Sequence, residues 1–438
     1  MKVKGKNYKS IWLDKKKSIV VVIDQRQLPH EFKLLYLKNI KEIKKAIKEM
    51  VVRGAPLIGV TAAYGIYLSM KKDPSDKNLN TSVNFLKDAR PTAVNLSWAL
   101  GHMKRKLLNE KPLNRADLSK KLAEEISNND IECCKKIAEN GLKIILAIKK
   151  RKKNKPINIL THCNAGWLAT VDWGTALSPI FLAHRKKIKI HVWVDETRPR
   201  NQGSFLTSWE LLQEKIPHTI ITDNAGGHIM QHGMVDMCIT GSDRTTANGD
   251  VCNKIGTYLK ALSAYDNKIP FYVALPSNTI DLNSKNYLKD VPIEERNSDE
   301  LTYIHGINSK GKNTKIRITP RGSKVSNYSF DVTPAKYVTR LITEKGIHKP
   351  SKIEIKSKEI MDQSIEVLTS NPVYMAVAVV LAIVILLGVI KKLLKLVLVV
   401  SAILVLWVAY MVWSGQDITV DRLKEGIQSG VETVKEKA

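Results

Sequence analysis

Residues 157–175 read INILTHCNAGWLATVDWGT, and this stretch decides the fold. A short apolar run, 157–160, ends in small and polar residues that include Cys163, and a helical-looking continuation comes next. The pattern predicts a buried strand that stops at a glycine-containing turn and leads into a helix. Ligands bind outside the carboxyl ends of strands in open α/β sheets, so this thiol lies where chemistry is expected. A buried structural cysteine is the alternative, since free cysteines are often buried.

Further apolar runs end in the same way and alternate with helical segments such as 204–215 and 254–263. The runs are 188–194, 218–221, 234–239 and 269–274. This alternation predicts a mostly parallel sheet that helices cover on both faces. One edge of the sheet would then hold five side chains: Cys163, Asp195, Asp223, Asp243 and Asn278. The sequence has neither GxGxxG nor a Walker motif, so a Rossmann-like sheet does not imply a dinucleotide.

The aspartates at these strand ends differ in the residues on their carboxyl side. Asp195 and Asp223 fit structural roles, such as capping a helix or holding a turn. Asp243 precedes the run ANGDVCNK at 247–254, which has a turn-forming Asn-Gly pair and ends in Lys254. A carboxyl, a tight turn and a lysine at the start of a predicted helix suit a phosphorylated ligand.

The first 150 residues look mainly helical, with apolar residues at helical spacing in 39–52 and 118–148. Two arginines, Arg53 and Arg90, stand just before apolar helical segments that have a proline near their start. Free N–H groups at a helix start bind anions, and a guanidinium adds a bidentate grip on phosphate. A surface ion pair is the alternative for each arginine. The basic run KKRKKNKP at 149–156 is predicted to be a linker between domains.

Composition narrows the function classes. The 438 residues are enough for two or three domains, and the five cysteines are odd in number and lack CxxC pairing. No secretory signal precedes them, so we expect a reducing, cytoplasmic compartment without disulfides or a zinc knuckle. The net charge of +28 comes mostly from lysines spread along the chain. Nucleic-acid recognition favours arginine, so a solvated basic surface without a nucleic-acid partner is expected.

Long strings of this chain, in order, resemble the methylthioribose-1-phosphate isomerase family. They are VVRGAPLIGVTAAYG, RPTAVNLSWAL, ILTHCNAG, DETRPRNQG, TDNA, GSDRTTANGDVCNKIGTY, PFYVALPSNTID and PIEER. The resemblance covers residues from about 10 to about 348. It implies a small, mainly helical N-terminal domain and a Rossmann-like catalytic domain, as in the regulatory subunits of translation initiation factor 2B.

The resemblance also implies an activity: aldose–ketose isomerisation of 5-methylthioribose 1-phosphate to 5-methylthioribulose 1-phosphate in methionine salvage. It implies a homodimer that uses no metal or nucleotide cofactor. Carried over by position, Cys163 is the catalytic cysteine and Asp243 the proton donor. The substrate-binding positions are Arg53, Gly54, Ala55, Arg90, Gln202, Asn253 and Lys254. Burial raises the pKa of a carboxyl, which would let Asp243 protonate the ring oxygen as the sugar ring opens.

Two other functions fit the same fold. A non-enzymatic regulatory subunit would not need the Cys163 and Asp243 pair or the two arginine sites. A ribose-1,5-bisphosphate isomerase would need a second cationic site in place of an apolar one. Here Trp167, Asp172 and Trp173 stand where the family pattern has small residues, and the indoles would favour an apolar pocket if they reach it. Packing into the next helix is the alternative for them.

The chain after Ile355 has no counterpart in the family. Residues 373–390 and 396–413 are two uncharged runs of 18, separated by a lysine-containing stretch. A helix of that length spans about 27 Å, close to the hydrocarbon core of a bilayer. The runs therefore predict two transmembrane segments, or an in-plane hairpin, that attach the catalytic domain to a membrane. A buried hairpin in a soluble oligomer is the alternative.

The predicted organisation has five parts. They are the N-terminal helical domain at 1–150, the catalytic domain at 151–350, a tether at 351–371, the hydrophobic hairpin at 372–414 and an amphipathic helix at 415–438.

Overall fold

The computed structural model describes residues 1–90, 93–284, 290–291 and 293–350, with scattered residues between 387 and 414. Residues 1–356 form one compact unit and 357–438 a second. The predicted tether, both predicted transmembrane segments and the C-terminal amphipathic helix lie wholly or mostly outside the described residues. None of the helices in the described part of the chain combines the length and apolar character that crossing a bilayer requires. The membrane attachment therefore stays a prediction from sequence.

The first unit begins with strands, which the sequence pattern did not predict because they are short. β1 (Lys2–Val3) pairs with β2 (Lys6–Asn7), and three antiparallel strands come next. These three are β3 (Ile11–Asp14), β4 (Ile19–Ile23) and β5 (Leu34–Leu37). The helices after them are α1 (Ile40–Lys48), α2 (Ala55–Lys72), α3 (Asp76–Lys87), α4 (Val94–Leu108) and α5 (Arg115–Lys152).

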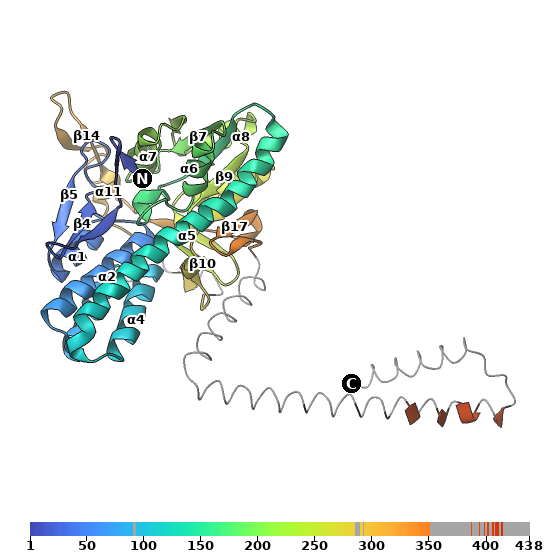
Figure 1. Cartoon of the computed structure of the whole chain (residues 1–438). Helices are drawn as coiled ribbons and strands as arrows, with labels where there is room; N and C mark the ends of the chain where they lie inside the picture. The colour runs from blue at the N-terminus through green and yellow to red at the C-terminus, as the bar shows by residue number, and fades with distance from the viewer. Residues whose placement is uncertain are drawn as a thin grey trace. The chain divides into compact units, whose positions relative to one another are not determined.

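Helix α2 lies at the centre of the N-terminal helices. It is buried from Leu57 to Met70 and packs against α4 and α5, so its sequence is apolar on all sides rather than on one face. Helix α5 continues past this cluster and packs on α6 (Ser178–Arg185) and on the sheet beyond it (Figure 1). The predicted linker is therefore wrong over 149–152, which belong to α5.

The prediction of a mostly parallel sheet is confirmed. A seven-stranded sheet has six parallel strands and one antiparallel edge strand. In spatial order the strands are β18 (Gly346–His348), β17 (Arg340–Thr343), β12 (Phe271–Ala274), β9 (Met237–Thr240), β6 (Ile157–Thr161), β7 (Ile190–Asp195) and β8 (His218–Ile221). The chain builds outward from β6 to β8 on one side and through β9 on the other. The strand order therefore reverses between β6 and β9, where doubly wound sheets bind ligands.

Helices cover both faces of this sheet (Figure 1). Ile157 and Ile159 of β6 point into a core shared with α5, α6 and α7 (Ser208–Gln213). Leu160 points to the other face, into a core with α8 (Ala225–Gln231) and α9 (Thr257–Asp266). Because both faces of β6 are covered, apolar residues stand on both sides of the strand, at Ile157, Ile159 and Leu160.

The segment after β6 departs from the prediction of a direct strand-to-helix turn. Only a single 3₁₀ turn, η2 (Trp167–Ala169), lies there, and the next helix is α6. Lys254 also does not start a helix, because it ends strand β11 (Val251–Lys254). That strand belongs to a small second sheet with β10 (Arg244–Thr246), β13 (Ile280–Asp281) and β16 (Phe330–Thr333). A projecting hairpin, β14 (Tyr303–Ile307) and β15 (Asn313–Arg317), completes the unit.

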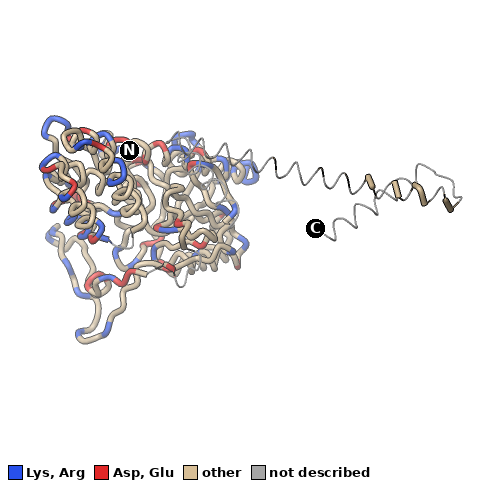
Figure 2. The backbone as a smooth tube through the Cα atoms, turned by 90° about the horizontal axis from the view of Figure 1, so that it is seen from below, with Lys and Arg blue, Asp and Glu red and all other residues tan. Residues whose placement is uncertain are grey.

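Lysine and arginine positions are scattered around the first unit rather than gathered on one face (Figure 2). This distribution agrees with a solvated basic surface.

Candidate active site

A cavity of about 630 Å³, counting its open mouth, lies at the switch point between β6 and β9. Its walls come from the start of α2, the loops after β6 and β9, and the end of β11. The structure brings all nine predicted site residues onto these walls. They are Arg53, Gly54, Ala55, Arg90, Cys163, Gln202, Asp243, Asn253 and Lys254.

Cys163 lies two residues past the end of β6, in a left-handed backbone conformation with φ of 65°. Its N–H donates to Thr197 Oγ1 at 2.8 Å, and its carbonyl accepts from Thr207 Oγ1 at 2.7 Å. Burial raises the pKa of the thiol, although Arg53 and Lys254 oppose the shift. The thiol is therefore protonated at neutral pH and donates to Gln202 Oε1 at 3.2 Å.

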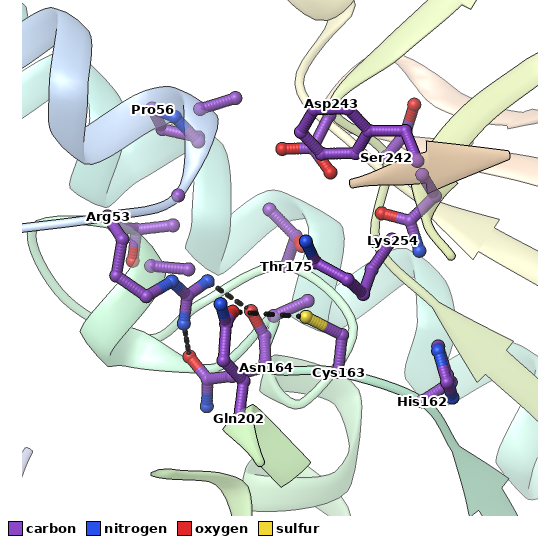
Figure 3. Close-up of a pocket in the computed structure, with 18 of the residues that line it drawn as sticks. Arg53, Pro56, His162, Cys163, Asn164, Thr175, Gln202, Ser242, Asp243 and Lys254 are labelled. Carbon is purple, nitrogen blue, oxygen red and sulfur yellow. Dashed lines mark hydrogen bonds between the residues drawn. The ribbon is translucent and has the colours of Figure 1, made fainter. Parts of the chain in front are cut away.

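Arg53 is buried directly before α2. Its guanidinium donates to the side-chain and backbone oxygens of Asn164 (Figure 3), the latter at 2.5 Å. Gly54 caps the helix with φ of 92°, and a Cβ there would collide with the backbone of Ala169. Only glycine therefore lets the positive end of α2 approach the loop after β6 this closely. Free N–H groups at a helix start and a guanidinium are both groups that bind anions, so this corner of the cavity is chemically suited to one.

Arg90 enters the cavity from the segment before α4 and is 9% exposed. It donates to Glu294 Oε2 at 2.7 Å, while its Nε has no partner among the described residues. Arg90 thus has one carboxylate partner and one buried donor that no described residue satisfies.

Asp243 and Lys254 form the opposite wall, after β9 and at the end of β11. Burial raises the pKa of the Asp243 carboxyl, against the pull of Lys254, Arg90 and Arg53. Lys254 is buried with its ammonium over the Phe330 ring, 4.9 Å from the centroid, and burial lowers its pKa. The ammonium points into the space between Cys163 and Asp243 (Figure 3). Asn253 donates to Thr257 Oγ1 at 3.0 Å, which fixes its side chain beside the cavity.

A second ionic cluster lies behind the cavity. His162 Nδ1 is 2.8 Å from Asp195 Oδ2, and its Nε2 donates to the carbonyl of Ile255 at 2.8 Å. Lys260 Nζ is 3.2 Å from the same Asp195 oxygen. The carboxylate of Asp223 accepts backbone N–H groups of Thr197 and Arg198, each at 2.7 Å. His162, Asp195 and Asp223 have metal-ligand types, but the Lys260 ammonium already supplies the cation. The structural interpretation of both aspartates is therefore favoured.

Several side chains expected near the site lie elsewhere. Trp167 is fully buried against Trp209, and Trp173 stacks on the Arg185 guanidinium at 4.5 Å. Asp172 binds the N-terminal amine at 2.9 Å. The three therefore pack into the fold, as the packing interpretation of the sequence held, and the two indoles do not line this cavity.

Two other groups that the sequence placed near the site also lie elsewhere, because residues close to the site in sequence need not be close to it in space. Asn278 accepts from Asn95 Nδ2 at 3.2 Å in an adjoining cavity. The Asn-Gly turn at 248–249 lies beside Pro350, at the far end of the β10–β11 hairpin.

Sequence reasoning missed Asn164 as a partner of Arg53, and it missed Glu210. Glu210 is fully buried and accepts from Asn164 Nδ2 at 2.9 Å. Its carboxylate also accepts the N–H groups of Trp167 at 2.9 Å and Leu168 at 3.1 Å. The available signal was an acid four residues after the buried Leu206, on the apolar face of a helix.

Residues 51–350 match the initiation factor 2 subunit family. The chain belongs to this family. Within the initiation factor 2 subunit family, it is 55% identical to the methylthioribose-1-phosphate isomerase of Brucella anthropi over 352 residues, which cover 80% of this chain and 97% of that one. It is 53% identical to the Escherichia coli protein of the same name over 353 residues, which cover 80% and 95%.

Solved structures in this family agree. The 5-methylthioribose 1-phosphate isomerase of Pyrococcus horikoshii is 37% identical, with a TM-score of 0.68 over 80% of this chain and 96% of that one. The delta subunit of translation initiation factor eIF-2B from A. fulgidus is 38% identical, with a TM-score of 0.64 over 78% and 96%. Structural likeness alone does not separate these two names, whereas the sequence relatives carry the isomerase name.

Proposed function

We propose that this chain isomerises 5-methylthioribose 1-phosphate to 5-methylthioribulose 1-phosphate in methionine salvage. The observation that carries the proposal is the cavity at the switch point, where a thiol and a carboxyl share walls with Arg53, Arg90 and Lys254. A phosphate monoester carries close to two negative charges at neutral pH, so it matches these cations and the N–H groups of α2. The relatives of 53–55% identity carry the name of this isomerase.

In this proposal Asp243 is the acid. The anomeric carbon carries the phosphate ester, so the ring opens only as the bond from C1 to the ring oxygen breaks and that oxygen takes a proton. Burial raises the pKa of the Asp243 carboxyl, which favours the protonated form that can supply this proton. The hydrogen on C2 then moves to C1, and the C2 hydroxyl gives its proton to the Asp243 carboxylate left by ring opening. This step leaves a ketone at C2 and CH₂–O–phosphate at C1 and restores the acid.

Cys163 is the second catalytic residue of the proposal. Its buried thiol lies between the Arg53 anion site and Lys254, beside the place for C1 and C2. The thiol and the cations around it are buried, so cations and dipoles act strongly on charge that develops during hydrogen transfer. Gln202 holds the thiol in place, and Asn253 and Gly54 shape the cavity wall.

A second cavity adjoins the first and shares Met50, Arg53 and Gln202 with it, so it is the place for the substituent at C5 of the sugar. A bisphosphate would need an unpaired cation there. Arg53, which lines both cavities, is assigned here to the first phosphate. The other arginines and the lysine that line the second cavity have carboxylate partners: Arg26 with Asp24, Arg200 with Glu300 and Lys315 with Asp299. A neutral methylthio group therefore fits better than a second phosphate.

A direct assay separates the candidates. The purified protein is incubated with 5-methylthioribose 1-phosphate and, separately, with ribose 1,5-bisphosphate, and ketose formation is measured over time. The proposal predicts turnover of the first substrate and little or none of the second. The reverse preference would identify a bisphosphate isomerase, and inactivity on both would favour a regulatory subunit.

Two further proposals rest on the family and on the tail sequence. We propose that the enzyme is a homodimer, which light scattering of the purified protein tests. We also propose that residues 373–413 attach the cytoplasmic catalytic unit to a membrane, on the sequence pattern alone.

A further inference from the structure

Glu210 is the carboxyl that the catalytic proposal leaves without a role. It lies in α7 with no exposed surface, and three N–H donors converge on it from Asn164, Trp167 and Leu168. A Cβ on Gly166 would overlap its carboxylate, so the loop after β6 is wrapped closely around this one side chain. Burying a carboxylate costs free energy unless several donors hydrogen-bond to it, so a buried acid with three donors points to a specific role.

The orientation of the Asn164 amide indicates that role. Its Nδ2 donates to Glu210 and to Thr207 Oγ1, at 2.9 and 3.1 Å. Its Oδ1 is therefore left to accept from the Arg53 guanidinium. A guanidinium has only donors, so an amide turned the other way would present donors to donors. The carboxylate thus fixes the amide, and the amide fixes the plane of the guanidinium.

We propose that Glu210 is a positioning residue that acts through Asn164 to aim Arg53 at the substrate's phosphate, and that only the ionised carboxylate does so. The inference rests on the proposed function, because it takes Arg53 as a phosphate ligand.

Protonation shows why the charge state matters. A carboxylic acid must donate its proton, yet the polar groups that contact Glu210 are all N–H donors, from the loop after β6. The charged group that acts on it is Arg53, from the start of α2. An Asn164 flip would give the acid an acceptor but would turn Nδ2 toward the guanidinium. Burial raises the pKa of Glu210 to about 7. As the pH falls through that value, the Arg53 orientation is lost and KM rises.

The test begins with E210Q, which keeps the size of the side chain but replaces one acceptor oxygen with a donor. We expect KM to rise about 10- to 100-fold, the range for residues that orient groups of a site, with a smaller change in kcat. The matched control is E214Q. Glu214 lies just past the end of the same helix and pairs with Arg185 instead of facing the cavity. We expect E214Q to keep the wild-type KM.

A double-mutant cycle with N164A decides whether Glu210 acts through Asn164. If it does, E210Q raises KM far less in the N164A background than in the wild type, because the link is already broken. If the two effects on KM multiply, Glu210 acts by another route and the proposal is wrong.

The pH profile supplies a readout that a merely structural role would not move. The substrate phosphate titrates near pH 6 in every variant, so the comparison between proteins isolates the protein group. We expect the wild-type KM to rise below about pH 7 and this rise to be absent from E210Q. An identical acid limb in both proteins would overturn the proposal.

A catalysis-independent measurement separates this inference from the proposed function. NMR of the protein labelled with ¹³C at glutamate carboxyls should show one carboxyl that titrates near pH 7 and is missing from E210Q. If the wild type titrates in this way but has no isomerase activity, the proposed function fails and the Glu210 titration stands. If E210Q does not fold, the test uses the wild type alone. The proposal then requires KM to rise over the same pH range in which the Glu210 carboxyl titrates by NMR. A KM that stays constant over that range contradicts it.

Discussion

Asp195 and Asp243 stand at the ends of β7 and β9, strands of the same sheet, yet their surroundings differ completely. Asp195 has no exposed surface; the Lys260 ammonium compensates its charge, and His162 Nδ1 lies 2.8 Å from its carboxylate. Asp243 borders a cavity, and burial raises its pKa against three cations that surround the cavity rather than bind the carboxyl.

The difference separates location from role. The end of a parallel strand places a side chain near the ligand edge, but the groups that face it decide whether it is held or free to react. Asp195 is committed to internal partners, whereas the carboxyl of Asp243 faces the cavity. Substitutions at these positions and around the cavity test that contrast, beginning with the largest expected effect.

Removing the Asp243 acid should abolish most activity without harm to the fold. We expect Asp243→Asn, and likewise Cys163→Ser, to lower kcat by about 10²- to 10⁴-fold, as the loss of an acid or base commonly does. When the pKa of a carboxyl is higher in the folded than in the unfolded protein, its ionisation above the unfolded pKa destabilises the folded protein. Asp243→Asn should therefore leave Tm unchanged or raise it at neutral pH. Near-normal turnover in either variant would remove that residue from the mechanism.

Asp195→Asn should show the opposite pattern. It leaves the Lys260 ammonium without its buried counter-charge and His162 without its carboxylate partner, and breaking a buried ion pair costs about 3–5 kcal/mol. Denaturant unfolding measures this loss, and residual kcat per folded molecule should exceed that of Asp243→Asn. A stable Asp195→Asn variant without activity would place Asp195 in the chemistry and invalidate the contrast.

Arg90→Ala should act on binding. Truncating one member of a buried, hydrogen-bonded charge pair costs about 2–5 kcal/mol, which here falls on substrate affinity and on Glu294. Steady-state kinetics should show a higher KM with a smaller fall in kcat. If both parameters match the wild type, Arg90 only holds Glu294 in place.

The fall of kcat toward alkaline pH should reveal the ionisation of Asp243. The acid form is the reactive one, so kcat falls as the pH rises through its raised pKa. Rate profiles on both sides of neutrality measure this limb, which Asp243→Asn should lack.

The smallest effect belongs to the tail. Truncation after Ile355 removes none of the cavity walls, so kcat and KM should match those of the full chain. The full chain should remain in the pellet after carbonate washing and ultracentrifugation, and the truncated chain should not. A soluble full-length protein would show that the membrane prediction is wrong.

The sequence predicted the parallel sheet, and all nine residues that it proposed for the site line the cavity. Strands such as β12 (FYVA) are largely apolar and end at turn residues, so both the strand and its end can be recognised in the sequence. The resemblance to the isomerase family then assigned Arg53 and Asp243, which lie far apart in the chain, to one site.

The remaining features depend on contacts between segments distant in sequence. Glu210 reads as one acid in an ordinary helix, and only the folded loop after β6 reveals its three donors. Trp167 and Trp173 stand close to Cys163 in sequence, but the chain turns them into the core and onto Arg185. Such positions depend on packing, which local periodicity does not encode.

The most direct test of the central claim is a ³¹P NMR time course of 5-methylthioribose 1-phosphate with the wild type and with Asp243→Asn at equal folded concentration. The account predicts that the wild type converts the sugar phosphate to the ketose phosphate and that Asp243→Asn does so at least about 100 times more slowly. A folded wild type that leaves the substrate unchanged, or an Asp243→Asn variant that matches it, would contradict the account.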